Sequence, residues 1–138
     1  MYVAVASTQN KSDAEAGDML ETGRTYVEEG DNETRSFFYG QMGDIYLEVG
    51  RDSAALSMYD KALSYNASNI AVLNNYSYFL ATEGRDLDKA ERMSAQTVKA
   101  EPDNATYLDT YAWIFFKKGD YSLARRYMKN ALDKNQEA

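Results

Sequence analysis

Small and hydrophobic residues recur along the chain with the spacing of an α-helix. One run places such residues at positions i, i+3, i+4 and i+7, and its members are Tyr39, Met42, Gly43 and Tyr46. A second run with helical spacing follows Gly50, and its members are Ala55, Tyr59 and Ala62. The alternation of a β-strand is absent. The pattern therefore predicts two consecutive helices separated at Gly50.

This pair of helices repeats twice more. Ala55, Ala90 and Ala124 are 35 and then 34 residues apart, and the first helices repeat in step. The other sets in register are Gly43, Ser77 and Ala112; Tyr39, Leu73 and Leu108; Met42, Tyr76 and Tyr111; Tyr46, Leu80 and Phe115; Ala62, Thr97 and Ala131. The recurrence predicts helices over 36–49, 53–65, 70–83, 87–100, 105–118 and 121–134.

Residue size predicts how these helices pack. Small residues such as Gly43 and Ala90 are expected where two antiparallel helices approach closely. Large residues such as Tyr59, Leu80 and Met128 are expected to fill the space between neighbouring pairs. Gly50, Gly84 and Gly119 are expected to break the first helix of each pair from the second.

The repeat resembles the tetratricopeptide repeat. The segments 36–69, 70–104 and 105–138 resemble three complete units, and 1–35 resembles a partial N-terminal repeat or capping helix. The resemblance implies an all-α, right-handed superhelical solenoid of antiparallel helix pairs. A chain that begins inside a repeat suggests a piece of a longer protein.

Composition and charge exclude several classes of function. The chain has neither cysteine nor histidine, so thiolate and imidazole catalysis and the common zinc sites are excluded. A net charge of −7 disfavours binding to a phosphate backbone, and we expect no nucleic-acid partner. No stretch approaches the length of a membrane span, so direct membrane insertion is not expected. We expect no enzymatic activity, no cofactor and no metal.

The remaining candidates for acid–base or charged sites have structural explanations. Asp86 and Asp88 are expected to solvate and cap the helix that begins at residue 87. The last helix carries four basic residues, which are expected on a solvated outer face, and these are Arg125, Arg126, Lys129 and Lys134.

The resemblance also implies a binding surface. In tetratricopeptide solenoids the first helices line the concave face, where ligands bind. The positions expected there to bind a peptide are Asp44, Asn74, Tyr78, Asp109, Trp113, Phe116 and Lys117. Tyr78, Trp113 and Phe116 would form an aromatic stripe on that face. The alternative for Trp113 and Phe116 is packing against a following helix outside this fragment. A basic clamp for acidic chaperone tails is disfavoured, because the equivalent places hold Gly40, Asp44 and Asn74.

These features predict a non-enzymatic scaffold that binds a protein or peptide partner. One alternative is a regulatory or positioning segment of a larger enzyme, such as a glycosyl transferase. Another is self-association as a weak homodimer through Tyr127 and Leu132 on the last helix. Phrases such as Leu87-Asp88-Lys89-Ala90-Glu91 also resemble bacterial tetratricopeptide proteins that are often exported lipoproteins. That resemblance implies a periplasmic or surface location for the full-length protein, and otherwise a cytoplasmic one.

Overall fold

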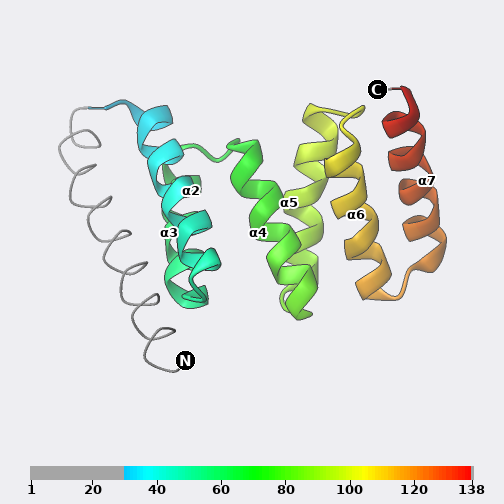
Figure 1. Cartoon of the computed structure of the whole chain (residues 1–138), viewed down its shortest axis with the longest axis horizontal. Coiled ribbons are helices and arrows are strands. Elements are labelled where there is room, and N and C mark those ends of the chain that lie inside the picture. The colour runs from blue at the N-terminus through cyan, green and yellow to red at the C-terminus, as the bar shows by residue number, and fades with distance from the viewer. Residues whose placement is uncertain (1–29, 138) are drawn as a thin grey trace, which may run out of the picture. The chain divides into compact units, whose positions relative to one another are not determined.

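Six helices follow one another in a computed structural model that describes residues 30–137, with side chains to residue 135. In chain order they are α2 (Asn32–Glu48), α3 (Asp52–Tyr65), α4 (Ile70–Glu83), α5 (Leu87–Ala100), α6 (Ala105–Lys118) and α7 (Tyr121–Glu137) (Figure 1). The partial unit expected within residues 1–29 lies outside the described residues. The chain divides after Asn69 into two compact units. Unit one contains α2 and α3, and unit two contains α4 to α7.

The helices expected from the hydrophobic spacing are confirmed, and α4, α5 and α6 have the bounds that the repeat predicts. The largest difference is at the start of α2, which begins four residues before the expected position. Asp31 explains this early start, because its side chain accepts a hydrogen bond of 2.8 Å from the Thr34 amide and caps the helix.

The breaks between paired helices occur at the three expected glycines. Gly50, Gly84 and Gly119 have φ angles of 79°, 67° and 86°, in the left-handed region that glycine adopts without a Cβ clash. The Gly119 amide donates to the carbonyls at the end of α6 and closes that helix.

In unit one, α2 and α3 pack as an antiparallel pair around small residues. Ala55 and Ala62 on α3 are fully buried. The α-carbon of Gly43 on α2 lies so close to the Tyr59 ring that an added Cβ would be 2.5 Å from its Cδ1 and Cε1 atoms. The close approach expected from the small residues is therefore present in this pair.

In unit two, α6 packs against both α4 and α5, and α7 packs against α6. The core includes Leu80, Ala90 and Ile114, each no more than 1% exposed. Lys118 at the end of α6 links the helices across the surface, because its Nζ lies 2.7 Å from Asp88 and 2.9 Å from Glu91 on α5. The salt bridge lowers the pKa of the Asp88 carboxyl and raises that of Lys118.

Two expectations about this unit are wrong. Met128 was expected in the core but is 38% exposed, because no described helix covers that face of α7. Asp86 makes no side-chain capping bond, because its backbone is left-handed with φ of 46°. Its carbonyl accepts the Ala90 amide instead, while the neighbouring Asp88 binds Lys118.

Candidate functional site

The predicted binding residues divide between the two units. Asp44 lies on α2 in unit one, whereas Asn74 and Tyr78 lie on α4 in unit two. The other four, Asp109, Trp113, Phe116 and Lys117, lie on α6. Because α4 and α6 pack against each other, the structure brings the unit-two residues onto neighbouring helices.

Asp44 already has a partner inside unit one. The Tyr59 hydroxyl donates a hydrogen bond of 2.5 Å to the Asp44 carboxylate. Tyr59 is fully buried, and burial followed by the hydrogen bond to Asp44 raises the pKa of its hydroxyl well above the ordinary value. The contact gives Asp44 a structural role in holding α2 against α3.

The hydrogen bond between Tyr59 and Asp44 predicts a pH-dependent effect of Tyr59→Phe. Loss of a hydrogen bond to a charged acceptor should lower the free energy of unfolding by about 1.5 kcal/mol at neutral pH. Because the folded pKa lies above the unfolded pKa of about 10, the native state favours the protonated hydroxyl. That contribution is complete below pH 10 and is lost as the pH rises further. The difference between parent and variant should therefore shrink by about 1.4 kcal/mol per pH unit above 10. Urea unfolding at neutral and alkaline pH measures it, and a constant difference would contradict the assigned hydrogen bond.

Asn74 is buried rather than open to a ligand. Its side chain is 9% exposed, and its Oδ1 atom has no hydrogen-bond partner. By contrast, Tyr78 on the same helix is 51% exposed, and Asp109 on α6 is also exposed. The repeat register thus identifies residues on the first helices without fixing which of them reach the surface.

Trp113 and Phe116 form the centre of the exposed aromatic surface. Their rings stack with centroids 5.6 Å apart and planes inclined by 9°. The Trp113 indole Nε1 donates to the Thr82 hydroxyl of α4 over 3.3 Å. Lys117 holds its ammonium 5.5 Å from the centroid of the Trp113 ring. Together with Tyr78, Asp109 and Thr82, these residues define what we call the first-helix face of unit two.

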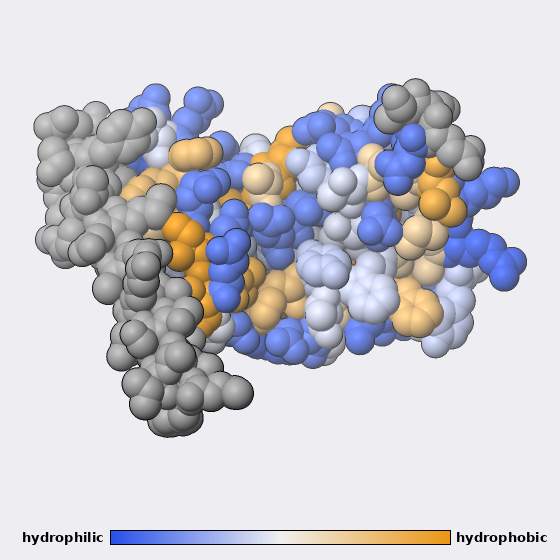
Figure 2. Space-filling view, viewed as in Figure 1, coloured by the Kyte–Doolittle hydropathy of each residue, from blue (hydrophilic) through white to orange (hydrophobic). Residues whose placement is uncertain are grey.

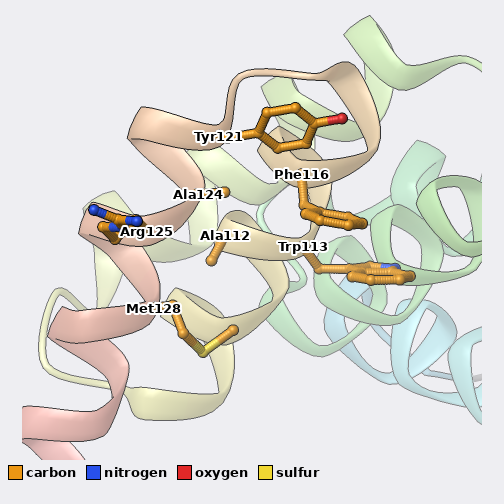
Figure 3. A pocket seen from close by; sticks show the side chains of 7 residues that line it. All are labelled: Ala112, Trp113, Phe116, Tyr121, Ala124, Arg125 and Met128. Carbon is orange, nitrogen blue, oxygen red and sulfur yellow. The ribbon is translucent and has the colours of Figure 1, made fainter.

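A pocket of about 420 Å³ opens beside this face, between α6 and α7. Its lining is almost wholly apolar and consists of Ala112, Trp113, Phe116, Tyr121, Ala124, Arg125 and Met128. Figure 3 shows the two alanines between the aromatic side chains on one side and Arg125 and Met128 on the other. We call this pocket the end pocket.

Figure 2 shows hydrophobic patches set among hydrophilic side chains on one face of the molecule.

Residues of α7 were missed as part of the site. Tyr121, whose ring lies 5.5 Å from that of Phe116, and Met128 occupy positions that hold Leu87 and Ser94 one repeat earlier. The sequence signal for these two residues was that each is larger than the residue at the equivalent position of the preceding repeat. Arg125, expected on a solvated outer face, is exposed and also lines the end pocket. Lys134 lies 3.2 Å from Asp103.

The homodimer is not supported. Of the two residues on which it rested, Tyr127 packs its ring against Tyr111 and Phe115, with centroids 4.7 and 5.8 Å away. Leu132 is 55% exposed. Of the two side chains expected to form an apolar contact with a second copy, only Leu132 is therefore largely exposed.

The described surfaces offer groups for non-covalent contact with a partner. Among residues 30–137, no three acidic side chains gather as a metal site would require. No helix in that range is long and apolar enough to cross a membrane. The surfaces offer aromatic stacking, apolar contact and a few exposed charges, which suit the binding of a polypeptide.

Comparisons with known proteins agree with this fold. Residues 38–69 match the family model of the tetratricopeptide repeat. Over 86 residues, or 62% of the chain, it is 29% identical to the TPR repeat-containing thioredoxin TTL4 of Arabidopsis thaliana. Over 68 residues, or 49% of the chain, it is 34% identical to the uncharacterized protein ycf37 of Pyropia yezoensis. The matches span 12% and 38% of those relatives. Neither name describes an exported lipoprotein, and that expectation stays a prediction.

Two solved structures cover almost the whole chain. Crystal structures of MamA match 96% and 98% of it, with TM-scores of 0.68 and 0.67 and identities of 18% and 19%. The matches cover 85% and 78% of those chains. The protein therefore has an all-α, tetratricopeptide-like solenoid fold, and its relation to the tetratricopeptide repeat family is supported by the match over residues 38–69.

Proposed function

We propose that this protein is a non-enzymatic interaction scaffold and that a partner peptide binds the first-helix face of unit two. The observation that carries the proposal is the exposure of large aromatic side chains there. Tyr78 and Phe116 are 51% and 50% exposed, although both are large and mostly apolar. Burying such side chains against a partner removes apolar surface from water, which favours binding.

The charges around these aromatic residues suit an extended or helical peptide. Asp109 and Lys117 are exposed on α6, so they are available to polar or charged groups of a peptide that covers Trp113. Asn74 and Asp44 contribute less to this proposal. The first is buried, and the second accepts a hydrogen bond from Tyr59. The proposal therefore rests on the exposed residues of α4 and α6.

The alternative of a regulatory segment within a larger enzyme is not favoured. The names of the two curated relatives give no support to a glycosyl transferase.

Binding to the first-helix face can be tested with peptides selected from a displayed random library. Selected peptides should share hydrophobic anchors, and Tyr78→Ala should weaken the binding of a selected peptide by about tenfold, because an exposed aromatic anchor is lost. Isothermal titration calorimetry measures the change. Gln96→Ala, an exposed change on α5, is the matched control and should have no effect. Equal affinity of the folded Tyr78→Ala protein and the parent would place the binding site elsewhere.

A further inference from the structure

The end pocket occupies a surface that, one repeat earlier, is covered by a helix. Within unit two, α6 packs against the pair formed by α4 and α5. Ala81 on α4 and Ser94 on α5 are both fully buried. The repeat register relates them to Phe116 on α6 and Met128 on α7, because the first helices are 35 residues apart and the second helices 34. The second pair therefore presents the equivalent surface without a described helix on it.

Three residues on that uncovered surface are larger than their counterparts. Phe116 replaces Ala81 and is 50% exposed, whereas Met128 replaces Ser94 and is 38% exposed. Tyr121 replaces Leu87 and is 65% exposed. Ala112 and Ala124 between them are nearly buried, at 1% and 8%. Large side chains around small ones form a hollow into which a helix can place hydrophobic residues (Figure 3).

The charges on the same surface indicate which charge the last turn of a bound helix should carry. Where α6 covers α5, Lys118 in its last turn bonds to Glu91 over 2.9 Å and to Asp88 over 2.7 Å. One repeat later, Glu91 is replaced by Arg125 and Asp88 by Ser122. The sign of the charge is reversed, so a helix in the same position would need a carboxylate where α6 has Lys118. Arg126 and Lys129, also exposed on α7, increase the positive charge nearby.

We propose that the end pocket binds an amphipathic helix of a partner protein, with an acidic residue in its last turn facing Arg125. The helix would lie on α6 and α7 as α6 lies on α4 and α5. This surface goes beyond the proposed peptide site, because it depends on Tyr121, Arg125 and Met128 of α7. A second copy presenting α6 fits poorly, because α6 ends in Lys117 and Lys118.

Trp113 provides a direct readout of binding, because it lines the end pocket and is the single tryptophan of the chain. The probes are three synthetic peptides of the length of α6, 14 residues, with leucine at helical spacing on one face and no tryptophan. The first has glutamate in its last turn, and the second has lysine there. The third has the sequence of the first except for one central residue, which is replaced by proline to break the helix.

The glutamate peptide should change the Trp113 fluorescence saturably and bind about tenfold more tightly than the lysine peptide. The proline peptide should bind at least as weakly as the lysine peptide. Arg125→Glu should reverse the preference between glutamate and lysine. Met128→Lys should abolish binding of the glutamate peptide, because a charge would enter the apolar hollow. Circular dichroism checks that these exposed changes leave the protein folded.

Tyr78→Ala separates this proposal from the peptide site, because Tyr78 does not line the end pocket. The variant should bind the glutamate peptide as the parent does, even if it loses the peptides selected by display. Equal affinity for the glutamate and lysine peptides, or a preference unchanged by Arg125→Glu, would overturn the proposal. It would also be overturned if sedimentation showed a dimer of the parent that Met128→Lys dissociates, since the pocket would then hold a second copy.

Discussion

Replacing Ala90 with tryptophan should destabilise the protein by about 3 kcal/mol, because it overpacks the centre of unit two. Ala90 is fully buried on α5, a helix that packs against both α4 and α6. Ser77, the small residue on the first helix of the same pair, is also fully buried. An indole has no space to enter unless α5 moves away from its neighbours. Urea unfolding followed by far-ultraviolet circular dichroism measures the loss of stability.

The matched control for Ala90→Trp is Arg92→Trp. Arg92 lies two residues further along the same helix and is exposed, so the same indole there should change stability by less than about 0.5 kcal/mol. If the two variants unfolded at the same urea concentration, Ala90 could not lie at the contact between helices that the repeat predicts.

The sequence was sufficient to predict the helices and their close contacts because both follow from local spacing and residue size. Gly84 and Gly119 end helices through their own backbone conformation, which depends little on distant residues. Ala55 and Ala90 are buried at equivalent places because the same helix pair forms each time. The start of α2 was missed because Asp31 lies outside the repeated positions, although its capping bond to Thr34 is local.

The state of individual site residues could not be predicted from the repeat register. The position of a residue in the repeat predicts which face of its helix it occupies. Its exposure to solvent also depends on the side chains of the neighbouring helix. The hydrogen bond that the Tyr59 hydroxyl of α3 donates to Asp44 was not foreseen from the position of Asp44 in the repeat. Arg125 was expected on an outer face; it is exposed, and it also lines the end pocket together with Met128, which stands where α5 has Ser94. These outcomes depend on pairs of residues in different helices or repeats.

The contact between Gly43 and Tyr59 leads to the second large effect, that of Gly43→Ala. The new Cβ would lie 2.5 Å from two ring carbons of a fully buried side chain. Tyr59 cannot turn away freely, because its hydroxyl donates to Asp44. Alanine gains about 1 kcal/mol in helix propensity over glycine, but overpacking should exceed that gain. We expect a net loss of about 2 kcal/mol in the free energy of unfolding, measured by urea titration.

A double-mutant cycle separates the steric effect from helix propensity. In a Tyr59→Ala background the ring is absent, so adding Gly43→Ala should stabilise the protein by about 1 kcal/mol. The sign of the Gly43→Ala effect should thus reverse between the two backgrounds. The equivalent positions in the other two helix pairs agree with this steric limit. There the first helix has Ser77 or Ala112 instead of Gly43, and the second helix has Ser94 or Met128 instead of the Tyr59 ring. If Gly43→Ala had the same sign with and without the Tyr59 ring, the approach of α2 to α3 would not be limited by that ring.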